Sequence, residues 1–365
     1  MQETLEETEL QTRAHKNDFV GCDIFSGAGG MSLGAEMAGI NISFAVENDK
    51  YASETFKQNH PNSQIILNDI QKVNPTELIS SNPFVLFGGP PCQGFSLSNT
   101  ITRNSKNKKN NLFEEYLRFI KELEPEWCVF ENVEGFRSFQ KGKIVGILKK
   151  RLESLGYKIN FSVLVASDYG VPQDRKRFFM VGNKNGVKFD FPKAIKDRFT
   201  VADALSDLPS LNNGDYIEDL PYLTSANNSF SSLMRINSTR SKQNFVSRNK
   251  NYVLERYKHI GQGENWRAIP EELMSNYANT DNCHSGIYKR LDANKPSVVI
   301  SNYRKNMLIH PYEDRGLSVR EAARLQSFPD DFIFQGTLMY MQQQIGNAVP
   351  PILAKALFKK IIEMS

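Results

Sequence analysis

The sequence predicts an α/β fold in which a doubly wound sheet carries helices on both faces, together with a second, smaller domain. Three observations predict it. Short apolar runs alternate with helical patterns from residue 19 to about residue 190. The first run leads into a glycine-rich turn that opens a helix. Polar side chains follow directly after successive runs, at the sheet edge where ligands bind in this class.

The composition is that of a globular protein. The chain has 365 residues, of which 40% are hydrophobic and 24% charged, so it can bury a large core. It has no apolar run of membrane-spanning length and no secretory start, and we expect a cytoplasmic protein with reduced cysteines. None of its four cysteines forms a Cys-x-x-Cys pair, so we expect no metal site. The polar residues 1–17 are expected to form a tail outside the fold.

The first two strands frame a candidate ligand site. A strand over residues 19–25 leads through a glycine loop into a helix over residues 31–38. The loop lacks dinucleotide and Walker A spacing, which indicates a nucleotide-like ligand without a pyrophosphate. A second strand, residues 42–46, ends at Glu47, about 20 residues after the loop, where an acid can bind ribose hydroxyls. The alternative is a helix N-cap, which suits Asn48 or Asp49 better.

The next two strands deliver further polar groups. The third strand, residues 64–67, precedes Asp69, which can accept a hydrogen bond from an adenine-like amino group. The fourth, residues 83–87, leads into GGPPCQGFS at residues 88–96, a tight loop that presents Cys92. A thiol at this edge is a candidate nucleophile, and a buried apolar residue is the common alternative. The basic, polar residues 96–111 that follow predict a lid.

The fifth strand adds a carboxyl at the same edge. It spans residues 127–130, follows a helix over residues 112–123, and ends at Glu131. Partial desolvation there would raise the pKa of Glu131 and make it a proton donor, whereas helix capping is the alternative. A helix over residues 142–155 and strands at 159–166 and 178–181 follow. The motif QDRKR at residues 173–177 lies between these strands, and its arginines can hold carbonyl or phosphate oxygens or remain solvated.

Residues 191–336 break the alternation and predict a smaller domain of irregular or β structure, apart from one helix over residues 318–326. Ser318 and Glu321 form a capping box for that helix. Within this region, residues 231–260 contain seven Lys or Arg and one acid. Such a stretch suits a phosphate backbone or, with equal weight, a solvated face. Residues 337–365, which end in a helix over 352–362, are expected to return to the first domain, residues 18–190.

Taken together, the motifs resemble those of the cytosine-C5 DNA methyltransferase family. In chain order they are DIFSGAGG (23–30), END (47–49), NDI (68–70), GGPPCQGFS (88–96), ENV (131–133), QDRKR (173–177), RLQSFPD (324–330) and QIGNAVP (344–350). The resemblance covers residues 18–190 and 315–365. Residues 191–314 match no pattern, as expected for the variable target-recognition region of this family.

The resemblance implies a Rossmann-like domain that uses S-adenosylmethionine to methylate cytosine at a specific site in double-stranded DNA. Cys92 would form a covalent adduct with a flipped-out cytosine, and Glu131 would hydrogen-bond or protonate N3. Arg177, with Arg175 nearby, would hold O2 of the base or a flanking phosphate. RLQSFPD would support the smaller domain structurally. The cofactor pocket would be lined by Phe25, Gly27, Gly29, Glu47, Asp69, Ile70, Pro90 and Asn347.

The family analogy also implies a bacterial enzyme that protects host DNA from a cognate restriction endonuclease, and we expect a monomer. Two alternatives remain. One is a transfer-RNA cytosine-5 methyltransferase of the same fold, whose Cys-Phe-Thr motif is absent from this sequence. The other is a non-catalytic DNA-binding scaffold, although Cys92, Glu131 and both arginines are present.

Overall fold

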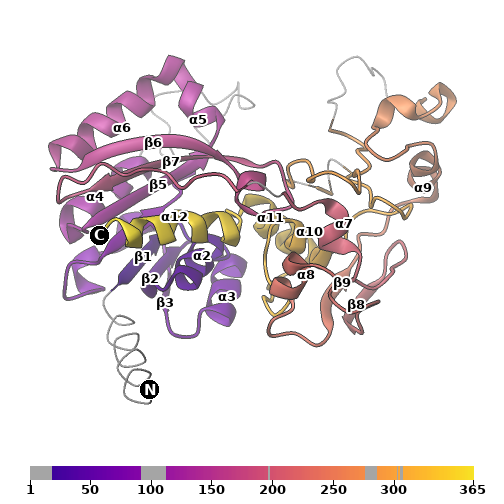
Figure 1. Ribbon diagram of the computed structural model, residues 1–365, viewed down its shortest axis with the longest axis horizontal. Helices are drawn as coiled ribbons and strands as arrows, with labels where there is room; N and C mark the ends of the chain where they lie inside the picture. The colour runs from indigo at the N-terminus through magenta and orange to yellow at the C-terminus, as the bar shows by residue number, and fades with distance from the viewer. Residues whose placement is uncertain (1–18, 92–111, 196–197, 276–285, 302, 305–306) are drawn as a thin grey trace, which may run out of the picture. The chain divides into compact units, whose positions relative to one another are not determined.

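A computed structural model of the chain describes residues 19–91, 112–195, 198–275, 286–301, 303–304 and 307–365 (Figure 1). The chain divides into two compact units. The first comprises Met1–Val165, Lys176–Ala194 and Pro351–Ser365, and the second comprises Ala166–Arg175 and Ile195–Pro350.

A seven-stranded sheet, built from the described residues, forms the centre of the first unit. Its spatial order is β3 (Gln64–Leu67), β2 (Asn41–Glu47), β1 (Val20–Ile24), β4 (Val85–Gly88), β5 (Trp127–Val133), β7 (Lys176–Asn183) and β6 (Lys158–Val165). Strand β7 runs antiparallel to both neighbours, and the other pairs are parallel. The strand order reverses between β1 and β4, and ligands bind beside such a switch point in this fold class.

Helices cover both faces of this sheet, which confirms the predicted α/β class (Figure 1). On one face, Leu86 belongs to a core cluster that includes side chains of α4 and α6. On the other face, the adjacent Phe87 contacts Phe358 of α12, with ring centroids 4.8 Å apart. The helices of this unit are α2 (Gly30–Ala38), α3 (Lys50–Asn59), α4 (Leu112–Leu123), α5 (Gly135–Ser138), α6 (Lys143–Ser154) and α12 (Pro351–Glu363), with 3-10 turns η2 (Ile70–Lys72), η3 (Pro75–Glu77) and η5 (Phe139–Gly142). No helix in the described ranges is long and apolar enough to cross a membrane.

The second unit is more helical than the sequence analysis predicted. Its one described sheet contains only β8 (Tyr216–Leu220) and β9 (Ser241–Phe245). Irregular structure predominates in the described residues between 195 and 336, as predicted, and the part that the sequence analysis missed consists of short helices. The helices are α7 (Val201–Leu205), α8 (Ser229–Met234), α9 (Asn251–Lys258), α10 (Val319–Leu325) and α11 (Leu338–Asn347), with 3-10 turns η6 (Ala166–Tyr169), η7 (Trp266–Ala268) and η8 (Glu271–Met274). The predicted capping box is present, since Ser318 caps α10 and bonds reciprocally with Glu321.

A buried hydrogen-bond network explains why the unit boundaries differ from the predicted domain boundaries. Residues 166–175 and 337–350 belong to the second unit. Gln173 donates to the carbonyl of Leu325 in α10, and its own Oε1 accepts from the Ile300 amide. Gln326 donates to the carbonyl of Ile345 in α11. These bonds join segments that are far apart in the sequence. Residues 166–175 and 337–350 therefore cannot be assigned to a unit by their position in the sequence alone.

Arg324 is the centre of the polar core of the second unit. Its side chain is fully buried and forms two hydrogen bonds with Asp330, of 2.8 and 2.6 Å, as well as bonds to Asp207. Tyr222 donates to the same Asp330 carboxylate. A buried charge held in this way is costly to remove singly, because its partners would be left unpaired. The geometry agrees with the structural role expected for RLQSFPD.

Gly34 allows a close crossing of α2 and α12. A Cβ atom at this residue would collide with the Ala354 Cβ and stand 2.5 Å from the Pro351 carbonyl oxygen. We expect Gly34→Ala to destabilise the protein by about 1–3 kcal/mol, because backbone atoms of α12 would have to move. Urea unfolding measures this change. Gly146→Ala in α6 is the control, since its Cβ would enter open space and the variant should be as stable as wild type or slightly more so. Equal midpoints for the two variants would contradict the packing argument.

Candidate active site

The glycine loop after β1 is tight on one side and open on the other. Phe25, Gly27 and Gly29 all have left-handed backbone angles, with φ of 64°, 56° and 91°. A Cβ at Gly29 would collide with the ring of His60, so no larger residue fits there. In contrast, apart from Gly27 and its two chain neighbours, no atom of the described residues lies within 4 Å of the place where a Gly27 Cβ would be. The loop therefore leaves space over Gly27 in which a ligand can approach the backbone.

Glu47 holds this loop in place from the end of β2. Its Oε2 accepts a 2.7 Å hydrogen bond from the Gly27 amide, and its Oε1 accepts bonds from the amides of Asn48 and Asp49. Burial raises the pKa of Glu47, and these backbone donors oppose the rise. Asp49 is the N-cap of α3, so the capping alternative applies to Asp49 and leaves the Glu47 carboxylate at the sheet edge.

The remaining predicted cofactor residues differ in their exposure. Asp69 is exposed and accepts a hydrogen bond from the Gln71 amide. The Ile70 side chain is 4% exposed and belongs to the core, so the prediction that it lines an open pocket is not supported for that side chain. Pro90 is buried next to β4. Asn347 is exposed at the end of α11 in the second unit.

These groups fit an adenosine-containing cofactor. The carboxylates of Glu47 and Asp69 follow neighbouring parallel strands and can accept hydrogen bonds from hydroxyl and amino groups. The open space over Gly27 has room for the ligand beside the loop. The fit rests on the first unit alone, because Asn347 lies in the other unit.

Glu131 and Arg177 form a buried ion pair at the edge of the sheet. The Glu131 Oε1 and Arg177 Nε atoms lie 2.9 Å apart, with side-chain exposures of 12% and 8%. The alignment is not that of a hydrogen bond, so charge attraction holds the pair. Burial raises the pKa of Glu131 to about 6, although Arg177 opposes the rise. Glu131 lies inside β5, which extends to Val133, so helix capping is excluded as its role.

The Glu131 carboxyl and the loop before Cys92 are positioned by two residues, Gly89 and Asn132. The sequence analysis did not single out either of them. A Cβ at Gly89 would lie 2.5 Å from Glu131 Oε2, so the carboxyl occupies space that only glycine leaves free. Asn132 donates a 3.1 Å hydrogen bond to the carbonyl of Pro90. The segment that leads into Cys92 is thus fixed to β5, whereas Cys92 and the predicted lid over residues 96–111 lie outside the described residues. The sequence signal that could have identified them is their place in the motifs, where Gly89 follows Gly88 and Asn132 follows Glu131.

Arg175 has a different environment from Arg177. Its side chain is 1% exposed and donates to the carbonyls of Ile300, at 2.8 Å, and Gly346, at 2.6 Å. With both terminal nitrogens engaged in this way, Arg175 supports the chain next to Asn347. We therefore correct the prediction that Arg175 contacts the base or a phosphate.

The basic stretch over residues 231–260 is only partly available to a ligand. Arg256 is 3% exposed and bonded to Leu273 and Tyr288, so it cannot contact a phosphate as predicted. Arg235, Arg240 and Lys258 form ion pairs with Asp207, Asp219 and Glu255, respectively. Within the described ranges, the exposed side chains of Lys242, Arg248 and Lys250 have no hydrogen bond or ion pair.

A rigid turn carries two of these three cations. Asn213 donates to the Asn249 carbonyl, and the Asn249 amide donates back to the Asn213 side chain. Arg248 and Lys250 flank Asn249, and the Arg248 side chain lies against Gly214. The reciprocal pair thus fixes the backbone between the two exposed cations.

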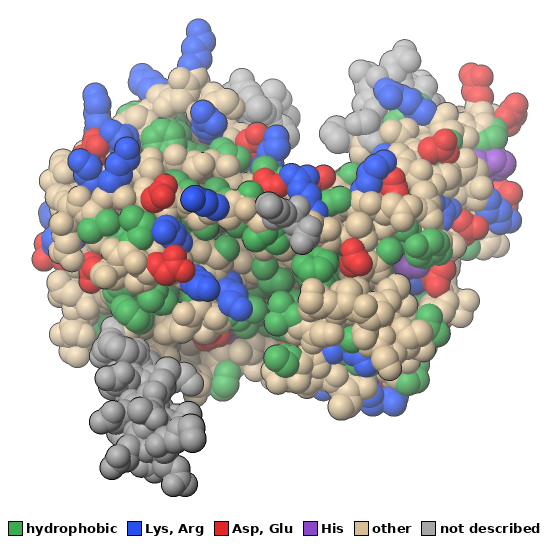
Figure 2. Space-filling view, viewed as in Figure 1, with side chains coloured by type: hydrophobic (Ala, Val, Ile, Leu, Met, Phe, Trp, Pro, Cys, Tyr) green, Lys and Arg blue, Asp and Glu red, His purple; other side chains and the backbone are tan. Residues whose placement is uncertain are grey.

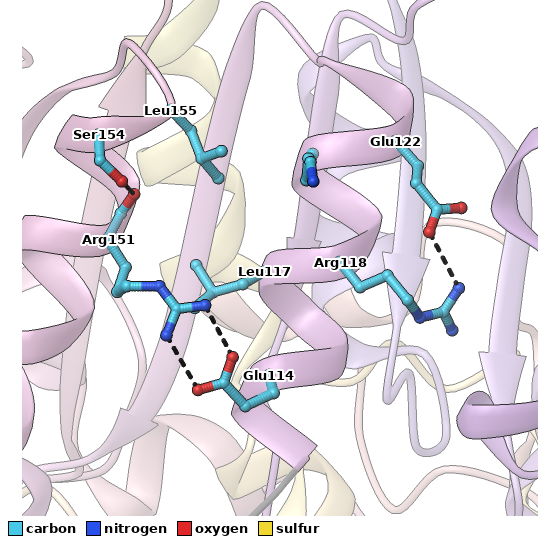
Figure 3. Close-up of a pocket in the computed structure, with 8 residues that line it drawn as sticks. Glu114, Leu117, Arg118, Glu122, Arg151, Ser154 and Leu155 are labelled. Carbon is cyan, nitrogen blue, oxygen red and sulfur yellow. Dashed lines mark hydrogen bonds and ion pairs between the residues drawn. The ribbon is translucent and has the colours of Figure 1, made fainter.

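A pocket of about 310 Å³ lies between α4 and α6 of the first unit (Figure 3). Its two arginines are paired with glutamates. Arg151 makes hydrogen bonds of 3.1 and 2.9 Å to Glu114, and Arg118 pairs with Glu122 at 3.6 Å. None of the predicted site residues lines it, and we assign it no catalytic role.

Comparison with known proteins identifies the family. Residues 19–363 match the C-5 cytosine-specific DNA methylase family. The chain is 35% identical to the type II methyltransferase M.DdeI of Desulfomicrobium norvegicum, over 93% of this chain and 87% of the relative. It is 34% identical to the type II methyltransferase M1.HphI of Haemophilus parahaemolyticus, over 94% and 86% of the two chains.

Solved structures agree with the fold. A structure described as a prophage-encoded DNA modification methyltransferase from E. coli is 29% identical, with a TM-score of 0.77, over 95% of this chain and 99% of that one. The Entamoeba histolytica methyltransferase EhMeth is 16% identical, with a TM-score of 0.62 over 95% and 98%, and shows the fold alone. The family match favours a DNA substrate over the transfer-RNA alternative. The chain therefore belongs to the family of C-5 cytosine-specific DNA methylases and is a DNA cytosine-5 methyltransferase.

Proposed function

We propose that this enzyme uses S-adenosylmethionine to methylate C5 of cytosine at one short sequence in double-stranded DNA, through a covalent adduct with Cys92. The observation that carries the proposal is the buried Glu131–Arg177 pair, located beside the segment that leads into Cys92. A carboxyl with a pKa of about 6 can donate a proton near neutral pH. An arginine fixed beside it can also donate to a base oxygen.

The residues of the first unit would hold the cofactor, which supplies an electrophilic methyl group on a sulfonium centre. Glu47 would accept hydrogen bonds from the ribose hydroxyls, and Asp69 from the adenine amino group. The backbone of the loop from Phe25 to Gly29 would approach the ligand where no side chain fills the space over Gly27. Pro90 and the Ile70 backbone would complete the contacts made by the first unit, and a role of Asn347 in holding the cofactor stays a prediction.

Cys92 would act as the nucleophile, and Glu131 would act as the proton or hydrogen-bond donor. The thiolate of Cys92 would add to C6 of cytosine, because sulfur is both a strong nucleophile and a good leaving group. Glu131 would protonate or hydrogen-bond N3, which draws electrons from C6 and favours this addition. This addition would place the electron pair of the former C5=C6 double bond on C5. C5 would then bond to the methyl group as the bond from that methyl to the sulfonium sulfur breaks, its electron pair remaining on sulfur. Loss of the C5 proton would finally restore the double bond as the bond from Cys92 Sγ to C6 breaks.

The target base must leave the duplex before Cys92 can reach it, at a cost of a few kcal/mol. We propose that the second unit recognises the DNA sequence in the major groove and that its exposed cations contact phosphates. The similarity to type II methyltransferases supports a role in protecting host DNA from a cognate restriction endonuclease.

Base-resolution mapping of 5-methylcytosine tests the proposed activity. In DNA from cells expressing the wild-type chain, we expect one short sequence to be methylated. Cys92→Ala should abolish that signal, because no other nucleophile is proposed, whereas Cys283→Ala should retain it. Methylation that survives in Cys92→Ala would refute the covalent mechanism. No methylated DNA with the wild-type chain, but methylated transfer RNA, would refute the proposed substrate.

Gly89→Ala tests the role of Glu131. The added methyl group would force the Glu131 carboxyl toward solvent, and we expect kcat to fall by about 100-fold, the scale of a lost proton donor. Desolvation is the largest cause of the raised pKa of Glu131, so exposure would lower that pKa. Because a proton donor fails above its pKa, the alkaline limb of the kcat/KM profile should move to lower pH.

Two other charged groups lie near Glu131. Arg177 on β7 lowers the pKa of Glu131, and Asp23 on β1 interacts with it as a second acid. Gly146→Ala is the matched control, because its methyl group would enter open space in α6 and meet no catalytic group. A Gly89→Ala enzyme with the kcat and pH profile of this control would show that Glu131 is not the proton donor.

Replacing Arg248 and Lys250 by alanine tests the proposed DNA contact of the second unit. If each side chain neutralises one phosphate, the slope of log K against log salt should become shallower by about 1.8, at roughly 0.9 per contact. The control is Arg240→Ala with Lys258→Ala, which removes the same charge from residues that have protein partners. Identical slopes for the two double variants would place Arg248 and Lys250 away from the DNA.

A further inference from the structure

The sheet register shows which parts of the first unit share an edge with Glu131. Val133, at the end of β5, pairs with Arg177, and Lys176 pairs with Val165 at the end of β6. At the other end of the sheet, Lys158 pairs with Asn183. Helix α6 directly precedes β6, so it runs from the Glu131 edge toward the opposite edge. The segment from α5 to the first turn of α6 therefore lies at the Glu131 edge.

Three cations in this segment have no partner within the part of the chain that the structure describes. Arg137, Lys141 and Lys143 are all exposed, and their side chains make no hydrogen bond or ion pair. The neighbouring acid, Glu134, is already paired with Lys176 at 3.2 Å. Figure 2 shows Lys and Arg side chains gathered over α5 and α6. The segment thus presents uncompensated positive charge.

The backbone of this segment has a defined shape. Phe136 and Phe139 are 4% and 9% exposed and anchor it in the core. The next three residues, Gln140, Lys141 and Gly142, have φ of 48°, 58° and 80°. Left-handed angles are costly for residues with a side chain, and they persist only where the surroundings impose them. The anchored turn fixes where the charged segment leaves the core.

We propose that Arg137, Lys141 and Lys143 form a phosphate-binding surface on the catalytic unit, which holds the DNA backbone next to the flipped cytosine. This inference rests on the proposed function. A flipped base stays attached to its own sugar and phosphates, so a base at Glu131 brings the flanking backbone to this edge of the sheet. Lys and Arg are the side chains that bind such phosphates, and the bonds position the strand without reading its sequence.

The alternative is a solvated face with no ligand, and the opposite edge of the same unit offers a matched control. Lys121, in the last turn of α4, Lys150 in α6 and Lys158 at the start of β6 are exposed as well. A variant with all three replaced by alanine loses the same charge as the variant Arg137→Ala, Lys141→Ala, Lys143→Ala. Only the location of the charge differs.

The experiment measures binding of a fluorescent duplex by each full-length triple variant as the salt concentration rises. For the Arg137 variant we expect a slope shallower than wild type by up to about 2.7, at roughly 0.9 per phosphate contact. The control variant should keep the wild-type slope and methylation rate. A third variant, Arg137→Lys, Lys141→Arg, Lys143→Arg, should also keep the slope, because it retains the charge.

Equal slopes for the two alanine variants would overturn the proposal. A slope lost in the charge-retaining variant would overturn it too, since packing rather than charge would then be responsible. Failure of the proposed function itself has a different signature, namely a wild-type enzyme that leaves DNA unmethylated. If the wild type methylates DNA and only the predicted slope change is missing, the phosphate-binding surface alone is refuted.

Discussion

The pairing of β5 with β7 is the constraint on which the candidate active site depends. Because β7 runs antiparallel to β5, Phe179 lies opposite Glu131, and Arg177 lies opposite Val133. Glu131 and Arg177 are therefore diagonal neighbours, a spacing that long side chains can bridge. Burial then makes each charge depend on the other, since either one left alone would be uncompensated in a poorly solvated place. A slip of β7 by one residue would turn Arg177 to the other face of the sheet and leave Glu131 without its partner.

Several motif glycines act through the space they leave rather than through an unusual backbone conformation. Gly88, Gly89 and Gly346 are not among the residues with positive φ, yet a Cβ at each would collide with or crowd another segment. The crowding atoms belong to Ile24, Glu131 and Ser301, respectively. The sequence analysis interpreted the glycines at 88 and 89 as turn formers. It assigned residues 344–350 to a family motif, with Asn347 in the cofactor pocket, and gave Gly346 no role of its own. Because the crowding residues lie far away in the sequence, local pattern could not distinguish the two uses of glycine.

The elements of the first unit were predictable because their signals are local. Apolar runs bounded by glycine or proline located the strands, and Cys22 and Cys128, which lie within two of these runs, are buried. Strand ends and long-range partners were not predictable. Arg175 and Arg177 are two residues apart in one motif, but one donates to the Ile300 and Gly346 carbonyls and the other pairs with Glu131. The two arginines differ in their partners from distant parts of the chain, and the local pattern of the motif does not show those partners.

The difference between buried and exposed arginines also affects how the net charge of the chain is interpreted. The chain carries 45 Lys and Arg residues and a net charge of +4, but many of its arginines are interior hydrogen-bond donors rather than surface charges. Arg290, Arg315 and Arg320 resemble Arg324 in donating to buried carbonyls or carboxylates. A phosphate backbone can attract only the exposed cations that lack an acid partner, so composition overstates the basic surface. The cations that remain lie in both units, so each unit by itself offers exposed positive charge that a phosphate backbone could attract.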